Sequence, residues 1–193
     1  MSLDIHDYIK VFDNSYFPSK QCKLIINSLD KSSSQKHVFS NASDIEKHVG
    51  DDPNICFLKP EKRTPIGDII KGQWYKLVGE YILKFLNVPW YAGWNGYSFP
   101  KFIEYKKGNS MKKHCDHIHS LFEGNPKSKG IPILSVITAL NDDYSGGDLI
   151  MCEKYKYKLK QGETIIFPSN FLYPHEITKI TKGKRYTAIS WVF

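Results

Sequence analysis

The run RYTAISWVF, at Arg185–Phe193, decides the fold class. Side chains alternate between the two faces of a β-strand, so Arg185 and Trp191 fall on one face and Tyr186 on the other. Five earlier runs share its β-branched and aromatic character: Pro100–Tyr105, Ser110–Asp116, Pro132–Asn141, Asp148–Cys152 and Thr164–Pro168. Turn residues separate these runs and no helical pattern lies between them, which predicts a sandwich or barrel and not a parallel sheet.

The chain before Pro89 has a helical pattern instead. Phe17–Leu29 carries apolar residues at helical spacing, and Thr64–Phe85 does so more strongly. We expect Thr64 to cap the second helix, with Pro65 in its first turn. The expected fold is therefore mainly β with supporting α: a double-stranded β-helix, the jelly-roll core of cupin-like proteins, flanked by N-terminal helices.

Two other N-terminal segments have no helical pattern. Val11–Asn14 resembles a short strand, and the polar, serine-rich stretch Lys31–Gly50 predicts a loop. The length of 193 residues fits one domain. We expect residues 1–98 to form a helical support and substrate-side segment, and residues 99–193 to form the catalytic core.

The composition narrows the class of protein. No signal peptide and no apolar run of membrane-spanning length is visible, so we expect a cytoplasmic protein, in a host cell if the chain is viral, with no membrane partner. Four scattered cysteines without a C-x-x-C pair predict free thiols. The net charge of +7 favours attraction of an anionic co-substrate or an acidic partner. Aromatic residues are not interleaved with the lysines, so nucleic acid is not an expected partner.

The strongest chemical signal is the tripeptide His114-Cys115-Asp116. If these residues lie in a strand, His114 and Asp116 share a face and can share a metal ion. His175, much further along the chain, is the candidate third ligand. Two histidines and one carboxylate on one side of an octahedron leave three open positions, which is the arrangement of non-haem Fe(II) oxygenases. Arg185, on the strand that follows, can grip a carboxylate through two parallel hydrogen bonds.

The order of these motifs resembles a known family. Tyr105, His114-Cys115-Asp116, LNDDYSGGDL (Leu140–Leu149), PHEI (Pro174–Ile177) and GKRYTAISW (Gly183–Trp191) follow one another as in the prolyl 4-hydroxylase branch of the 2-oxoglutarate/Fe(II) dioxygenases, of the small bacterial and phage type. The resemblance covers Phe99–Phe193. It implies Fe(II) bound by His114, Asp116 and His175, and 2-oxoglutarate bound by Arg185, with ascorbate as an expected reductant. It also implies that 2-oxoglutarate and O2 are consumed to hydroxylate a C–H bond.

The resemblance also suggests which residues surround the co-substrate. Tyr105 and Ser135 are candidates to contact 2-oxoglutarate, because Ala139 stands where several relatives have a tyrosine. Trp191 and His117 are candidates for the substrate side. His117 and His119 also form an H-x-H pattern, which leaves the choice of iron ligands open to test. The Gly146-Gly147 pair is expected to serve a turn.

Several functions remain open from the sequence. Prolyl hydroxylation of a peptide or protein is the leading interpretation, and the loop His117–Gly130 would be a lid over the iron. Hydroxylation of a free amino acid or small metabolite is an alternative, as is a non-catalytic metal-binding jelly roll. Asp116 disfavours halogenation, since a related halogenase would have a small residue there. Trp191 disfavours a nucleic-acid demethylase, because demethylases of that branch carry a second arginine at its position.

Overall fold

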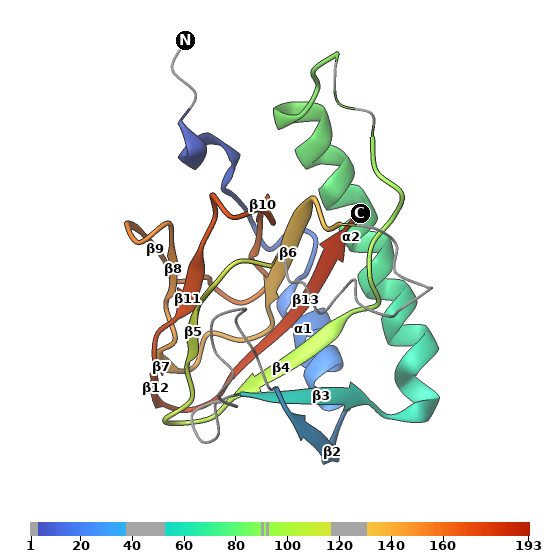
Figure 1. Ribbon diagram of the computed structural model, residues 1–193. Coiled ribbons are helices and arrows are strands. Elements are labelled where there is room, and N and C mark those ends of the chain that lie inside the picture. The colour runs from blue at the N-terminus through green and yellow to red at the C-terminus, as the bar shows by residue number, and fades with distance from the viewer. Residues whose placement is uncertain (1–3, 38–52, 90, 92, 117–130) are drawn as a thin grey trace.

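The computed structural model describes residues 4–37, 53–89, 91, 93–116 and 131–193 (Figure 1). Two α-helices occur in this part of the chain, α1 (Ser19–Asn27) and α2 (Arg63–Phe85), with two short 3-10 turns, η1 (Ile5–Tyr8) and η2 (Pro60–Lys62). The strands are β1 (Lys10–Phe12), β2 (Leu29–Lys36), β3 (Asn54–Leu58), β4 (Lys101–Tyr105), β5 (Met111–His114), β6 (Leu134–Ala139), β7 (Ser145–Gly146), β8 (Leu149–Met151), β9 (Tyr155–Tyr157), β10 (Thr164–Pro168), β11 (His175–Ile177), β12 (Ile180–Lys182) and β13 (Arg185–Val192).

The strands form a jelly roll of antiparallel sheets. The large sheet has seven strands in the order β1-β10-β6-β13-β4-β3-β2. A smaller sheet has the order β5-β11-β8-β9, and β12 pairs with β7. In Figure 1 the small sheet lies at the left and the two helices lie on the other side of the large sheet. The expected fold class, a double-stranded β-helix flanked by helices, is confirmed.

Two apolar cores follow from this layering. One lies between the helices and the large sheet and includes Phe17, Ile70 and Trp74. The other lies between the two sheets and includes Ile137 and Phe167. Central strands of the large sheet, such as β6 and β10, are therefore buried on both faces, which is why their sequences are apolar without a clear alternation.

Strand β6 shows how the two faces of the large sheet differ in what they contact. Val136 belongs to the core under the helices, and Ile137 belongs to the core between the sheets. On the helical face, the Thr138 hydroxyl accepts a hydrogen bond of 2.9 Å from Nε1 of Trp74 in α2. On the other face, Ser135 points to the space between the sheets, where it meets Asp116. One strand thus anchors the long helix and reaches the candidate metal site.

The long helix begins differently from the prediction. Thr64 was expected to cap α2, but the helix starts at Arg63, the cap position is Lys62, and no side chain caps it. The preceding turn η2 supplies the reason, because the Arg63 amide bonds to the carbonyl of Pro60 and the chain is already helical before Thr64. The predicted end is close to the observed one, at Phe85.

Residues 1–98 contribute strands as well as helices. The expected loop from Lys31 is wrong for its first part, because β2 pairs with β3 at the edge of the large sheet. Backbone hydrogen bonds alone can hold such an edge strand, so the polar side chains of residues 32–36 remain exposed and give no alternation to read. The rest of that segment, residues 38–52, lies outside the described residues.

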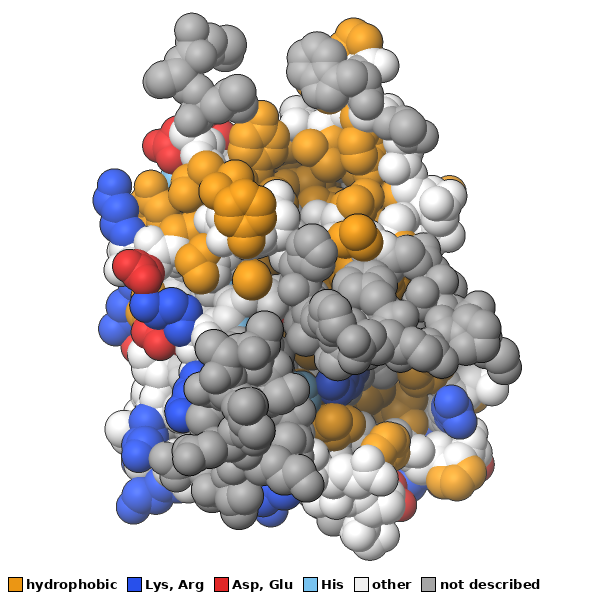
Figure 2. Space-filling view, viewed as in Figure 1, with side chains coloured by type: hydrophobic (Ala, Val, Ile, Leu, Met, Phe, Trp, Pro, Cys, Tyr) orange, Lys and Arg blue, Asp and Glu red, His pale blue; other side chains and the backbone are white. Residues whose placement is uncertain are grey.

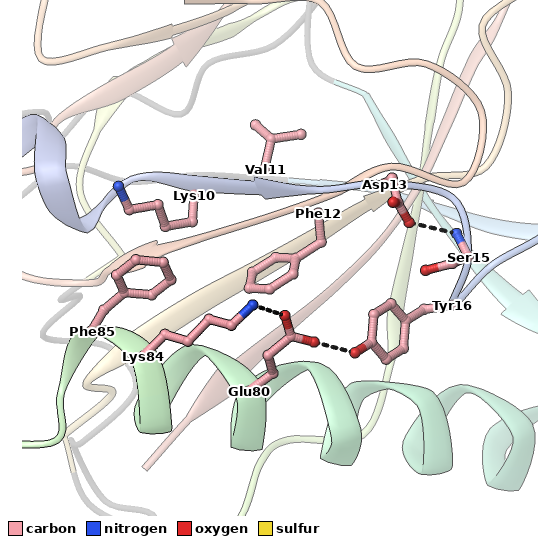
Figure 3. A pocket seen from close by; sticks show the side chains of 9 residues that line it. All are labelled: Lys10, Val11, Phe12, Asp13, Ser15, Tyr16, Glu80, Lys84 and Phe85. Carbon is pink, nitrogen blue, oxygen red and sulfur yellow. Dashed lines mark hydrogen bonds and ion pairs between the residues drawn. The ribbon is translucent and has the colours of Figure 1, made fainter.

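A polar pocket of about 370 Å³ separates β1 from the end of α2 (Figure 3). Glu80 of α2 accepts hydrogen bonds from the Tyr16 hydroxyl and, at 2.6 Å, from the Lys84 ammonium. Figure 3 shows these side chains bridging the helix and the segment that follows β1. The pocket joins the N-terminal segment to the helix and lies on the helical side of the large sheet. No helix in the described part of the chain has the length and apolar character to cross a membrane.

Candidate metal centre and co-substrate site

Strand pairing brings the two distant histidines together. In the small sheet β11 pairs with β5, and His175 lies directly opposite His114. Their ring centroids are 4.3 Å apart. Asp116 lies just beyond the end of β5, so the expected alternation within one strand does not place it. The bend after His114 turns Asp116 toward the same point instead.

The three side chains present their metal-binding atoms to one another. Nε2 of His114 is 3.6 Å from Oδ1 of Asp116, and Nε2 of His175 is 3.8 Å from the same oxygen. Donor atoms that each bind one ion at about 2 Å are separated by roughly 3–4 Å. All three residues are buried, and they are the one group in the described residues with metal-binding geometry.

Backbone carbonyls orient both imidazoles. Nδ1 of His114 is 2.7 Å from the carbonyl oxygen of Lys112, and Nδ1 of His175 is 3.1 Å from that of Tyr173. A carbonyl only accepts hydrogen bonds, so each Nδ1 carries the proton and each Nε2 is the nitrogen that bears a lone pair. Histidine ligands of metals are commonly held in this way. The geometry therefore fits a divalent cation bound by His114, Asp116 and His175.

The charge states also suit metal binding. Burial, aided by the neighbouring His175, lowers the pKa of His114 to about 4, so this imidazole is neutral at ordinary pH. Burial alone would raise the pKa of Asp116. The two histidines, and hydrogen bonding from Ser135 and Trp191, more than offset that effect and leave the pKa of Asp116 below its usual value. A neutral imidazole and an ionised carboxylate are the forms that bind metal.

Ser135 holds the second oxygen of the carboxylate. Its hydroxyl donates to Oδ2 of Asp116 at 2.5 Å and lies 2.8 Å from the hydroxyl of Ser169. Because Oδ2 is held by this bond, Oδ1 is left facing the two histidines. Ser135 was predicted to contact the co-substrate, and the structure places it against the metal-binding carboxylate.

Arg185 provides a buried cation between the two sheets. The residue is only 3% exposed, and its Nε has no hydrogen-bond partner among the described residues. Its guanidinium carbon lies 4.9 Å from the ring centre of Tyr105, its register partner on β4. A buried, incompletely paired guanidinium is costly unless an anion binds it. The donor geometry of Arg185 therefore fits one carboxylate of a dicarboxylate whose other end reaches the metal.

Two neighbours shape the space around Arg185. Tyr105 is buried, and burial raises the pKa of its hydroxyl to about 12, so it can act as a neutral hydrogen-bond donor. Gly147 has φ +66°, and a Cβ there would come within 3.1 Å of Cδ of Arg185. Gly146 lies in β7 and not in the expected turn, but both glycines have a positive φ that favours glycine, and Gly147 leaves room for the arginine.

A small cluster beside the metal site was missed in the sequence. The Lys101 ammonium lies 3.1 Å from Nε2 of His37 and 5.5 Å from the ring centre of Trp191. Lys101 stands two and four residues before Ile103 and Tyr105, so strand alternation could have placed it on the inner face. His37 gave no such signal, because β2 was expected to be a loop.

Some of the predicted site residues have no described position. His117, His119 and the expected lid His117–Gly130 lie outside the described residues. The H-x-H alternative for metal binding therefore stays untested. Trp191 is half-buried on the same face of β13 as Arg185, as its sequence position predicted.

Comparison with known proteins identifies the class. Residues 100–193 match the model of the 2OG-Fe(II) oxygenase superfamily. The matched part of the chain holds the three candidate metal ligands and Arg185.

Individual relatives extend the comparison. A PKHD-type hydroxylase of Acinetobacter baylyi is 30% identical over 97 residues, which are 48% of this chain and 42% of the relative. The chain thus spans less than half the length of that relative. The structure of a viral collagen prolyl hydroxylase from Paramecium Bursaria Chlorella virus-1 superposes with a TM-score of 0.64 at 15% identity, covering 96% of this chain and 94% of the other. A prolyl hydroxylase from Trichoplax adhaerens, solved with a peptide fragment of hypoxia inducible factor, gives a TM-score of 0.60 at 18% identity, covering 97% and 84%. At these identities the structures support the fold alone.

Proposed function

We propose that the protein is a 2-oxoglutarate- and Fe(II)-dependent dioxygenase that hydroxylates a prolyl residue in a peptide or protein. One observation carries the oxygenase part: the buried guanidinium of Arg185 lies against Tyr105, in the core between the large sheet and the small sheet that carries His114 and His175. A metal site that served only structure would not require a buried arginine whose Nε has no partner among the described residues.

Each residue has a definite task in this proposal. His114 and His175 offer Nε2 atoms already aimed by backbone carbonyls, and Asp116 offers Oδ1 while Ser135 holds Oδ2. Prior orientation of ligands reduces the entropy lost when the ion binds. Three protein ligands on one side leave the opposite side for co-substrate and O2.

The co-substrate would be held at its far end by Arg185, with Tyr105 against the guanidinium. When bound, iron and 2-oxoglutarate supply the oxidising chemistry, in which the co-substrate loses CO2 to become succinate and one oxygen atom enters a C–H bond. The protein contributes position and exclusion of water, and burial of Arg185, Tyr105 and Asp116 provides both.

The prolyl substrate is supported by similarity. Two of the structures that share this fold are described as prolyl hydroxylases, and one of them was solved with a peptide. Hydroxylation of a free amino acid or a small metabolite is the competing substrate class. Ascorbate belongs in the proposal as the reductant that returns oxidised iron to Fe(II).

The test is direct. Proline-containing peptides are incubated with the protein, Fe(II), 2-oxoglutarate, ascorbate and O2, and mass spectrometry measures a gain of one oxygen atom together with succinate. Tandem spectra then show whether the oxygen is on proline. A His175→Ala variant should form neither product. Succinate without any peptide product would support the oxygenase and contradict the peptide substrate.

The metal site can be tested without turnover. Fe(II) and 2-oxoglutarate added under anaerobic conditions should give a weak visible charge-transfer band. Absence of the band, with no succinate, would contradict the oxygenase proposal and favour a non-catalytic metal-binding jelly roll.

A further inference from the structure

A second, larger cavity adjoins the candidate metal site. It has a volume of about 510 Å³ and is lined by β3, the starts of β4 and α2, and Trp191 of β13. That volume falls within the range of small-ligand and peptide pockets. In Figure 2 hydrophobic side chains line this part of the face, where β3, β4 and the start of α2 lie in Figure 1. We call this cavity the β3–α2 trough.

The trough is apolar along its floor and cationic at two places. Phe57 and Phe99 on its walls are 40% and 42% exposed, which is high for large aromatic residues. The charged residues of its lining are Lys101 and Arg63, and no described residue of the lining is acidic. An exposed apolar surface bounded by polar groups commonly marks an interaction site.

Neither cation has a direct carboxylate partner in the described part of the protein, although the charge of Asp116 acts on Lys101. No described carboxylate forms an ion pair with Lys101 or with Arg63. Lys101 contacts a histidine and a tryptophan instead, and Arg63 lies 5.3 Å from the ring centre of Phe99, with Lys71 at 5.4 Å from the same ring. Surface lysines of this chain elsewhere do find carboxylates, as Lys113 does with Glu153 and Lys156 with Asp148.

The trough is connected to the metal site through two side chains. Trp191 lines the trough and is the register partner of Ser135, whose hydroxyl donates to Asp116. Lys101 stands on the same strand face as Tyr105, the residue beneath Arg185. A chain lying in the trough would therefore enter the site beside the metal-binding carboxylate.

We propose that the β3–α2 trough is the substrate groove and selects an acidic peptide, with carboxylates at Lys101 and Arg63 and apolar residues between them. The inference rests on the proposed hydroxylase function and adds the charge of its substrate. The positive charge of the whole chain, +7, favours the same class of partner. The two cations come from different elements, Lys101 from β4 and Arg63 from the start of α2, an arrangement that suits an extended peptide better than a compact metabolite.

The test uses three fluorescein-labelled peptides that differ only beside a central proline, with glutamate, glutamine or lysine on both sides. Binding to the protein loaded with Fe(II) and 2-oxoglutarate is measured anaerobically by fluorescence anisotropy, so no turnover is needed. The glutamate peptide should bind about fivefold more tightly than the glutamine peptide, since each partly exposed ion pair contributes up to about 1 kcal/mol. The preference should shrink in high salt.

Variants assign the preference to the trough. Lys101→Gln and Arg63→Gln should each reduce the glutamate preference by about half or more, while leaving the affinity for the glutamine peptide unchanged. Lys76→Gln, an exposed lysine of α2 outside the trough, is the matched control and should change nothing. Arg63 lies far along the chain from the metal ligands, so it tests the trough even if Lys101→Gln disturbs iron binding.

The outcomes separate this inference from the proposed function. Equal binding of the three peptides, or an unchanged preference in both variants, would overturn the acidic groove. If a free dicarboxylic amino acid displaced the glutamate peptide and was itself oxidised, the trough would be a metabolite site. Formation of succinate in the absence of peptide measures the oxygenase separately and does not depend on the groove.

Discussion

At the scale of single residues, the hydrogen bond from Ser135 to Asp116 is the contact most open to a simple test. Ser135→Ala removes the donor to Oδ2 and leaves the carboxylate free to rotate. Loss of a group that supports a metal ligand typically costs 10- to 100-fold in metal affinity, and we expect about tenfold weaker binding of Fe(II) or Co(II). Equilibrium metal titration measures it. Ser190→Ala, a buried serine bonded to Ser98, is the control and should bind metal normally.

Arg185 gives the second prediction at this scale. Arg185→Lys keeps the charge but loses the flat fork of donors, so we expect the KM for 2-oxoglutarate to rise by about tenfold or more, with metal affinity unchanged. Arg185→Gln should raise it further. Succinate formation at varied 2-oxoglutarate measures both. An unchanged KM in Arg185→Gln would mean that this guanidinium does not hold the co-substrate.

Much of this site could be predicted from the sequence, and the order of the motifs was a better guide than alternation within a strand. The structure brings the metal-binding atoms of His114, Asp116 and His175 within 4.8 Å of one another, as the motif order predicted. The local argument for Asp116 was wrong, however, because β5 ends at His114 and a bend places the carboxylate. The order of motifs along the chain predicts which residues meet in the folded protein. Alternation predicts which side chains share a face only within a single strand. Lys101 was overlooked although alternation from Tyr105 would have placed it.

At the scale of elements, α2 is tied to β6 by one buried hydrogen bond. Trp74→Phe removes the indole donor to Thr138 and leaves a small cavity. We expect the free energy of unfolding to fall by about 2 kcal/mol, measured by urea denaturation. Metal affinity should not change, because this bond is on the helical face of β6. Tyr75→Phe, a neighbouring aromatic that is 63% exposed, should leave both quantities unaltered.

The elements also differ in how well the sequence predicts them. The apolar stripe of α2 repeats over six turns, and each turn adds independent apolar positions. The end of this helix was therefore predicted with little error. Strand β2 could not be predicted, because its partner β3 supplies backbone hydrogen bonds and the side chains of residues 32–36 are exposed to solvent. The short strands β7, β11 and β12 are held by their neighbours in the same way, and two or three residues carry no periodic signal of their own.

At the scale of the whole molecule, the space between the sheets contains several ionisable groups away from water. Burial lowers the pKa of His37 to about 4, and the nearby Lys101 and His114 act in the same direction. The pKa of His114 is lowered to about 4 in the same way. An unfolded chain would bind protons at both histidines near pH 6.5, whereas the folded chain does not. The stability that these two neutral histidines contribute is therefore fully present above about pH 6.5 and is lost as the pH falls toward about 4.

Because stability falls as the pH falls, the last prediction concerns the protein from which a chelator has removed the metal. Between about pH 7.5 and about pH 5.5 the free energy of unfolding should fall by roughly 1 kcal/mol for each of the two histidines. Urea denaturation at both pH values measures the change. His37→Gln carries no titrating ring at that position, so its loss of stability over the same interval should be about half as large. An equal loss in wild type and His37→Gln would show that the imidazole of His37 can be protonated in the folded protein, beside Lys101.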